Sequence, residues 1–264
     1  GKVWLVGAGP GDPGLITVKG LHCIRNADVL VYDRLVCREL LAEVPAGCER
    51  INVGKTPNNH PIPQEEINQI LVTHAQRGRN VVRLKGGDPY VFGRGGEEVE
   101  TLARAGVEFE VIPGISSSIG GLAYAGIPVT HRDHASSFHV VTGHLQQGKE
   151  PQDWEHLARL QGTLVILMGM SQLEHICGEL MRHGRRSDTP AAAVMYASHR
   201  VQRIAAATLA TLADQVERQQ IKAPALIVIG EVVQLHTVLQ FVPTAFTLFG
   251  NLKNEFFHGR DWSG

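Results

Sequence analysis

The stretch VWLVGAGPGDPGLIT, residues 3–17, joins a short apolar strand to a glycine-rich turn and then to the start of a helix. The strand covers residues 3–6. Apolar side chains three positions apart place the helix at about residues 12–26, with Pro13 in its first turn. A strand, a tight turn and a helix in this order form the repeating unit of a parallel sheet with crossover helices. We therefore expect an α/β protein.

The same alternation continues to the middle of the chain. Helical patterns at residues 64–77 and 97–105 separate further apolar, β-branched runs at residues 29–32, 50–53, 80–85 and 109–112. Ligands of open α/β sheets bind at the carboxyl ends of the strands. Two of these ends carry glycine-rich loops, which allow a backbone to approach a ligand closely. We expect the chemistry of the protein to lie in these loops.

The second half of the chain has a different arrangement. A small-residue helix at residues 116–126 precedes apolar runs at residues 137–141, 163–168, 191–195, 202–208 and 225–230. The third and fourth runs lie too close together for a helical crossover, so they predict an antiparallel hairpin. The sequence thus predicts two α/β domains and a tail. The first domain, residues 1–113, has a mostly parallel sheet; the second, residues 114–242, has a mixed sheet; the tail is residues 243–264.

The glycines of the first turn also match a dinucleotide-binding pattern. Gly9, Gly11 and Gly14 form a G-x-G-x-x-G, and Asp33 follows about twenty positions later. A pyrophosphate turn uses free backbone N–H groups at a helix N-terminus, whereas Pro10 and Pro13 each remove one such donor. The strand is also followed directly by Gly7, so the G-x-G-x-x-G that starts at Gly9 begins late for a normal strand-to-helix turn. A nicotinamide-dependent oxidoreductase therefore stays an outside alternative.

Composition narrows the class of partner. Lys and Arg number 25 against 26 Asp and Glu, a balance that favours neither nucleic acid nor an anionic membrane surface. The four cysteines contain no C-x-x-C pair, which is untypical of disulfide frameworks and thiolate zinc sites. No apolar run approaches the roughly 18 to 20 residues of a membrane helix, and no signal-peptide pattern begins the chain. We expect a cytoplasmic protein with a small-molecule partner.

Thirteen histidines raise the possibility of a metal site. His131, His134, His139 and His144 lie near one another in sequence, but alternation along a strand would scatter them. No H-E-x-x-H or other paired ligand spacing occurs. We expect no metal site.

A set of longer motifs is more specific than the opening glycines. They occur in the order VGAGPGDPGLIT (6–17), RLKGGDPYVFGRGGEE (83–98), VIPGISS (111–117), AYAGIPVTHRD (123–133) and APALIVIGEVV (223–233). In these motifs the chain resembles the uroporphyrinogen-III C-methyltransferases, members of the tetrapyrrole methylase superfamily. The resemblance extends over residues 3–233, nearly all of the chain outside its tail.

The resemblance implies a homodimeric enzyme that binds S-adenosylmethionine in a cleft between its two domains. It implies successive methylation of uroporphyrinogen III at C2 and C7. The products would be S-adenosylhomocysteine and precorrin-2, the branch point toward sirohaem, cobalamin and haem d1. Two other functions are compatible with these motifs. One is a methyltransferase of the same superfamily that acts on a later corrinoid precursor, and the other is a catalytically silent binding module. YDRLV (32–36) and the loop at residues 86–98 favour the first reading over the later-acting relatives.

The resemblance also implies a set of cofactor contacts. By motif position, the residues that would contact S-adenosylmethionine are Pro10, Gly86, Gly87, Asp88, Val91, Ser116, Ser117, Met168 and Ala197. Without the resemblance, Gly86 and Gly87 are equally compatible with a simple tight turn, and Met168 with core packing. The family usually has Gly-Thr where this chain has Ala197-Ser198, and the Cβ of Ala197 would make the pocket slightly tighter at this loop.

Catalytic and substrate-binding roles follow in the same way. Asp33 and Lys55 match the proton acceptor and proton donor of the family, although the pair is also compatible with a salt bridge between two loops. The substrate carries eight carboxylates, which arginines bind well. Arg94, Glu97 and Arg132 are the candidates for substrate recognition, and Arg94 is a second candidate for proton handling. Either arginine is also compatible with a solvated surface position.

Overall fold

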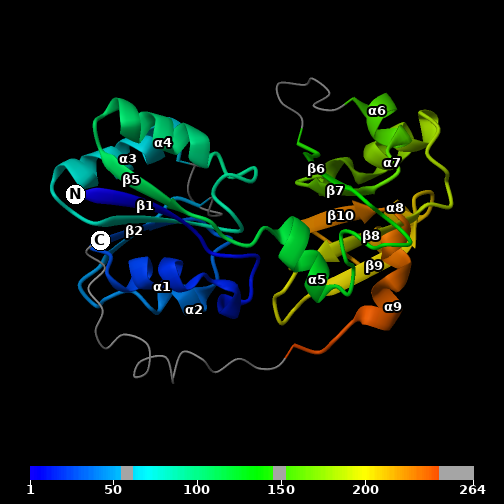
Figure 1. The fold of residues 1–264 in the computed structure, drawn as a ribbon, viewed down its shortest axis with the longest axis horizontal. Helices are drawn as coiled ribbons and strands as arrows, with labels where there is room; N and C mark the ends of the chain where they lie inside the picture. The colour runs from blue at the N-terminus through cyan, green and yellow to red at the C-terminus, as the bar shows by residue number, and fades with distance from the viewer. Residues whose placement is uncertain (55–61, 145–152, 244–264) are drawn as a thin grey trace.

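A computed structural model gives the fold and describes residues 1–54, 62–144 and 153–243 (Figure 1). Its first sheet has five parallel strands, as the sequence predicts. In spatial order these are β3 (Glu49–Asn52), β2 (Val29–Tyr32), β4 (Val81–Lys85), β1 (Lys2–Gly7) and β5 (Glu108–Ile112). The order places β1 and β4 at the centre, so the two glycine-rich loops that follow them are neighbours.

Helices cover both faces of this sheet, which explains why its central strands are apolar on both sides. One face packs against α3 (Gln64–Gln76) and α4 (Gly95–Arg104), and the other against α1 (Val18–Arg25) and α2 (Arg38–Leu41) (Figure 1). Side chains alternate along β4: Val81 packs with the α3 and α4 face, whereas Val82 and Leu84 pack with the α1 face. By the same alternation Arg83 and Lys85 belong to the α3 and α4 face.

The helix predicted at residues 12–26 is wrong in one respect, because it is broken into two. A 3-10 turn (Pro13–Leu15) precedes α1 (Val18–Arg25). Each has its own N-terminal cap: the Asp12 carboxylate accepts from the Gly14 N–H at 2.7 Å, and the Thr17 hydroxyl oxygen accepts from the Gly20 N–H at 3.0 Å. Two caps five residues apart cannot belong to one continuous helix.

The second sheet is mixed and contains the predicted hairpin. In spatial order its strands are β6 (Phe138–Thr142), β7 (Thr163–Leu167), β10 (Ala225–Ile229), β8 (Pro190–Met195) and β9 (Arg203–Thr208). β6 and β7 are parallel, and the other neighbours, including β8 and β9, are antiparallel. One core lies between this sheet and α6 (Trp154–Arg159), α7 (Leu173–Arg182) and α8 (Leu212–Arg218).

Short helical segments cover the other face of the second sheet. Its core includes residues of α5 (Leu122–Tyr124) and of a 3-10 turn (Glu231–Leu235), which leads into α9 (His236–Leu239). A π-helical turn (Ser117–Gly121) precedes α5, and another 3-10 turn (Met170–Gln172) precedes α7. The domain boundary predicted at residues 113–114 falls just after β5, where the chain leaves the first sheet. None of the described helices has the length and apolar character needed to cross a bilayer.

Candidate active site

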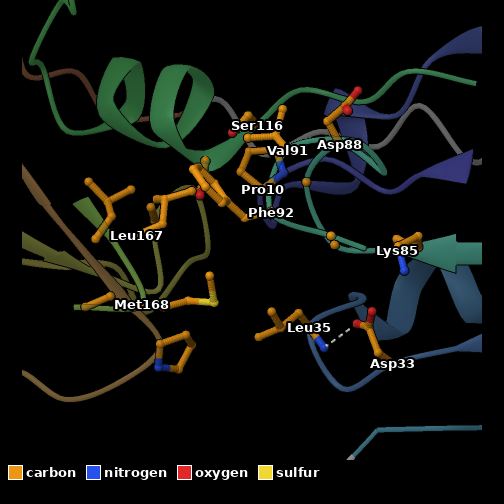
Figure 2. Close-up of a pocket in the computed structure, with 18 of the residues that line it drawn as sticks. Pro10, Asp33, Leu35, Lys85, Asp88, Val91, Phe92, Ser116, Leu167 and Met168 are labelled. Atoms are coloured by element: carbon orange, nitrogen blue, oxygen red, sulfur yellow. Dashed lines mark hydrogen bonds between the residues drawn. The ribbon is translucent and has the colours of Figure 1, made fainter. Parts of the chain in front are cut away.

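A cavity of about 610 Å³ lies between the two domains, and Figure 2 shows residues that line it. On one side it is lined by the loops that follow β1, β2, β4 and β5, and on the other by the ends of β7 and β8 and the start of β10. Its volume falls within the roughly 300 to 1,000 Å³ typical of small-molecule sites. The position at the carboxyl ends of parallel strands is the one expected for a ligand of an open α/β sheet.

The glycines of the first turn pair with the second glycine-rich loop. The Gly9 N–H donates to the Gly87 carbonyl at 3.2 Å, and the Gly87 N–H donates back at 2.8 Å. Both glycines have positive φ, 77° and 68°, which side chains rarely tolerate. The Gly14 N–H is already taken by the Asp12 carboxylate. These N–H groups are therefore used inside the protein, which counts against a pyrophosphate-binding turn.

The Asp88 carboxylate joins its own loop to the segment after β5 at the edge of the cavity. One of its carboxylate oxygens accepts from the Tyr90 N–H at 2.8 Å, and the other accepts from the Gly114 N–H at 2.9 Å. Gly114 lies directly on the backbone of Gly7 and Gly87: a Cβ built on it would lie 2.6 Å from the Gly7 Cα and would overlap the Gly87 carbonyl oxygen. The loops after β1, β4 and β5 are thus packed backbone against backbone at this point.

Apolar side chains line much of the cavity and are open to it. Leu35, Phe92 and Met168 are 53%, 43% and 50% exposed, and Figure 2 shows Leu35 and Met168 reaching from the two domains toward the same space. Phe92 and Met168 have φ of 52° and 56°. Backbone strain of this kind in non-glycine residues clusters at functional sites. Phe92 and Met168 therefore present apolar side chains to the cavity from strained backbone positions.

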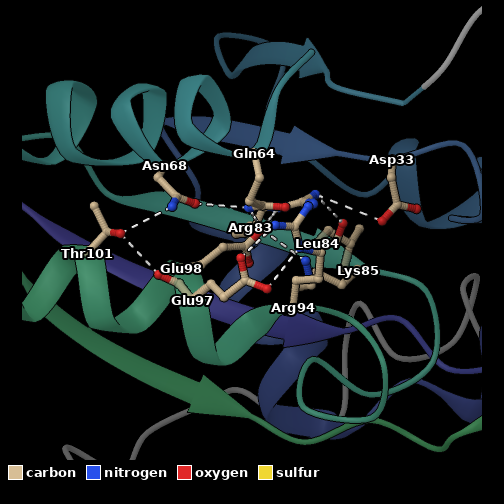
Figure 3. Close-up of polar contacts among 10 residues, drawn as sticks. All are labelled: Asp33, Gln64, Asn68, Arg83, Leu84, Lys85, Arg94, Glu97, Glu98 and Thr101. Carbon is tan, nitrogen blue, oxygen red and sulfur yellow. Dashed lines mark hydrogen bonds and ion pairs between the residues drawn. The ribbon is translucent and has the colours of Figure 1, made fainter. Parts of the chain in front are cut away.

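A buried polar cluster lies at the other end of the cavity (Figure 3). The Glu98 Oε1 atom on α4 accepts from Arg83 Nε and from Lys85 Nζ, both at 3.0 Å, and from the side-chain amide of Gln64 at 3.2 Å. Burial, together with the neighbouring Arg83, lowers the pKa of the Lys85 ammonium, and Glu98 opposes this. The Asp33 carboxylate, which follows β2, lies 4.0 Å from Arg83 Nη1.

Arg94 lies at the rim, beside Glu97. Its Nε and Nη2 atoms donate to the two Glu97 carboxylate oxygens at 2.9 and 2.6 Å. This forked hydrogen bond raises the pKa of Arg94 and lowers that of Glu97. Both side chains are exposed, so the pair is open to exchange with a ligand carboxylate.

The residues predicted to contact S-adenosylmethionine all line this one cavity, and so do Asp33 and Arg94. Glu97 does not line it directly and contacts Arg94 instead. Arg132 is exposed in the segment before β6 and is not among the lining residues. Lys55 lies outside the described residues. In the part of the chain that the structure describes, no group of three His, Cys, Asp or Glu side chains gathers as a metal site would require.

The buried cluster was missed from the sequence, although a signal for it exists. Arg83 and Lys85 are two residues apart in an otherwise apolar strand, so they share one buried face. A buried charge is costly unless it is paired, which predicts an acidic partner on the helix that covers that face. Glu98 on α4 is that partner.

His199 was also missed, and it joins the two domains. Its ring lies against Gly11, at the position that a Gly11 side chain would need. Burial lowers the pKa of the imidazole. The neighbouring Ser198, part of the Ala197-Ser198 departure, accepts through its hydroxyl oxygen from the Asp12 N–H at 3.1 Å. Although the chain has Ala197-Ser198 in place of Gly-Thr, the Ser198 hydroxyl still makes the contact between the loop after β8 and the first turn.

Comparison with known families and proteins agrees with the cavity. The family model for tetrapyrrole (corrin/porphyrin) methylases matches residues 2–213. The chain is 52% identical over 241 residues to the S-adenosyl-L-methionine-dependent uroporphyrinogen III methyltransferase of Methanosarcina barkeri. The alignment covers 90% of this chain and 94% of that enzyme. The chain is 51% identical over 239 residues to the siroheme synthase of Stutzerimonas stutzeri, covering 90% of this chain and 51% of the synthase, so it spans about half of that longer protein.

Solved structures give the same result. The uroporphyrin-III C-methyltransferase of Thermus thermophilus, complexed with S-adenosylhomocysteine, is 45% identical with a TM-score of 0.77, covering 89% of this chain and 100% of that one. A cobalt precorrin-4 methyltransferase of cobalamin biosynthesis is 30% identical with a TM-score of 0.79, covering 88% and 95%. The backbone is thus equally close to enzymes with different substrates, whereas the sequence is closer to the first.

Proposed function

The chain belongs to the tetrapyrrole (corrin/porphyrin) methylases, and from this we propose that it methylates uroporphyrinogen III at C2 and C7. S-adenosylmethionine is the donor, and precorrin-2 and S-adenosylhomocysteine are the products. The observation that carries the proposal is that one cavity between two sheets is lined by every motif residue expected to contact the donor. Relatives about half identical over most of the chain are uroporphyrinogen III methyltransferases and siroheme synthases.

The residues around the cavity fit the proposed donor. Gly86 has no side chain, and a Cβ there would lie 2.9 Å from the Leu35 Cβ, so glycine keeps the space open. When bound, S-adenosylmethionine supplies a sulfonium methyl group. We assign its contacts to Pro10, Gly86, Gly87, Asp88, Val91, Ser116, Ser117, Met168 and Ala197. The cavity holds both backbone polar groups and apolar side chains, which suits a ligand that has both characters.

The remaining residues suit a large acceptor with an apolar ring framework and many carboxylates. Leu35, Phe92 and Met168 present apolar surface to a macrocycle and exclude water from the reacting carbon. Arg94 binds a substrate carboxylate by exchanging it for Glu97, and Arg132 binds another from outside the cavity. Asp33, at the cavity wall, accepts the proton that the ring loses after methylation. Lys55 is assigned the matching role of proton donor from the sequence motif alone.

Two alternatives are weaker. A later corrinoid precursor as substrate is disfavoured because, among the solved structures, identity to the cobalt precorrin-4 enzyme is 30%, against 45% for the uroporphyrin-III enzyme. A nicotinamide cofactor is disfavoured because the N–H groups of Gly9 and Gly14 are already used. We also propose that the protein is a homodimer, from the family resemblance, and that it is cytoplasmic, from the sequence. The balance of acidic and basic residues favours neither a nucleic-acid nor a membrane partner.

A calorimetric titration tests the cofactor part of the proposal. We expect S-adenosylhomocysteine to bind with one site per chain and NAD to show no heat of binding. Gly86→Val should abolish the S-adenosylhomocysteine signal, because its side chain would occupy the cavity beside Leu35. Gly96→Val is the control: Gly96 is exposed on α4 with open space around it, so binding should be unchanged. NAD binding without S-adenosylhomocysteine binding would contradict the proposal.

A further inference from the structure

Arg83 is a buried arginine whose surroundings hold it firmly. Its side chain is 4% exposed, and it extends from β4 beneath the helices α3 and α4. Nε donates to Glu98 Oε1 at 3.0 Å, and Nη1 donates to the Leu84 carbonyl at 3.3 Å. An ionised side chain at such a position needs both a counter-charge and hydrogen bonds. Arg83 has both, one from a helix and one from its own strand.

The counter-charge, Glu98, is itself fixed. It is fully buried, and Oε1 accepts from three donors, Arg83, Lys85 and Gln64, whereas Oε2 has no hydrogen-bond partner in the described part of the chain. The Gln64 amide also donates to the Asn68 side-chain oxygen at 2.9 Å, and this bond within α3 fixes the orientation of the Gln64 side chain. Donors on β4 and α3 therefore fix the Glu98 carboxylate of α4 against Arg83. Regular elements of this kind hold a group more precisely than a loop does.

The other side of the Arg83 guanidinium faces Asp33. Nη1 lies 4.0 Å from Asp33 Oδ2, and Figure 3 shows Arg83 between Asp33 and Glu98. Asp33 is 28% exposed and lines the cavity, whereas Glu98 is closed off from solvent. The guanidinium thus bridges a carboxylate that cannot move and one that faces the cavity. Among the described residues, the Asp33 carboxylate also accepts one hydrogen bond, the loop contact of Oδ1 with the Leu35 N–H at 3.1 Å.

We propose that Arg83 is a positioning residue for Asp33: Glu98 holds the guanidinium, and the guanidinium sets the direction in which the Asp33 carboxylate faces the reacting carbon. This inference rests on the proposed function, in which Asp33 accepts a proton. A base must lie within hydrogen-bond reach of the proton it takes, so its direction matters as much as its presence. Because Glu98 holds Arg83 independently, the guanidinium keeps its place when Asp33 becomes neutral.

Steady-state kinetics on matched variants test the inference. Arg83→Met should lower kcat by roughly 100-fold, the size expected when a reacting group is misplaced by about 1 Å. The Kd for S-adenosylhomocysteine should stay at the wild-type value. The kcat of Arg83→Lys should fall between those of Arg83→Met and the wild type, because lysine keeps the charge but lacks the planar fork. The control is Arg104→Met, the same change at an exposed arginine of α4 whose ion pair is with Glu100; its kcat should be unchanged.

A double-mutant cycle separates positioning from an independent role. If Arg83 acts through Asp33, adding Arg83→Met to Asp33→Asn should lower the residual rate no further, measured with S-adenosylmethionine labelled in its methyl group. Additive losses would overturn the inference, and so would a wild-type kcat in Arg83→Met or a loss of S-adenosylhomocysteine affinity equal to the loss of kcat. If Arg83→Met does not fold, Arg83→Lys with a wild-type Tm is judged by the same criteria. A wild-type enzyme inactive on uroporphyrinogen III would instead overturn the proposed function, and the inference with it.

Discussion

Asp33→Ala is expected to lower the turnover of uroporphyrinogen III by roughly 10²- to 10⁴-fold, the usual contribution of a positioned general base. The Asp33 carboxylate lines the cavity, whereas Glu98 is buried and both Asp88 carboxylate oxygens accept backbone N–H groups. Folding should be affected only modestly, by about 1 kcal/mol, because the Asp33 side chain loses one backbone hydrogen bond and one long ion pair. The measurement is kcat under anaerobic conditions, alongside urea unfolding.

Two further variants make the Asp33 result specific. Asp33→Asn keeps the shape and the hydrogen bond to the Leu35 N–H but cannot accept a proton as a carboxylate does, so it should be nearly as slow. Asp188→Ala removes an exposed aspartate that pairs with Arg186 on the surface, and its turnover should match the wild type. Wild-type turnover in Asp33→Ala would remove Asp33 from the mechanism.

Gly114→Ala is expected to destabilise the protein by about 3 kcal/mol, the upper part of the usual range for overpacking. The added Cβ would meet backbone atoms of Gly7 and Gly87, which cannot rotate away as a side chain can. The loops after β1 and β4 would have to separate, and the bond from the Gly114 N–H to Asp88 would be strained. Because these loops line the cavity, affinity for S-adenosylhomocysteine should fall together with stability.

The same substitution elsewhere should have the opposite sign. Gly178 is exposed in the middle of α7, and a Cβ there would have no atom within 4 Å. Gly178→Ala should therefore stabilise the protein by roughly 0.5 to 1 kcal/mol, since glycine costs about that much in a helix interior. Urea unfolding of both variants measures the two effects side by side. Equal stability of Gly114→Ala and the wild type would show that the backbone contact at the cavity is not as close as described.

Much of the fold could be predicted because its strands are short, apolar runs with clear boundaries. The parallel first sheet and the β8 and β9 hairpin follow from run spacing alone. The helix at residues 12–26 could not be placed correctly, because apolar periodicity does not reveal that Asp12 and Thr17 each cap a separate segment. The order of the strands depends on which neighbours pair, which spacing does not determine.

The site was predictable only through motifs. The residues in the loops after β1, β4, β5, β7 and β8 are far apart in sequence, and the family resemblance, not spacing, grouped them. The contacts that the motifs left out are those made by tertiary packing: Glu98 with Arg83 and Lys85, and His199 against Gly11. Each needs two elements to be placed before the pair exists. Arg132 shows the converse, because its motif position places it near the substrate while the structure leaves it outside the cavity lining.

The most direct test is the mass of the tetrapyrrole after reaction. The protein is incubated anaerobically with S-adenosylmethionine and enzymatically generated uroporphyrinogen III, and the product is oxidised and weighed by mass spectrometry. We expect a gain of two methyl groups, and little methylated product from Asp33→Ala in the same reaction time. An unmodified tetrapyrrole, from protein that still binds S-adenosylhomocysteine, would contradict uroporphyrinogen III as the substrate and direct attention to the loop at residues 86–98, where substrate choice would have to differ.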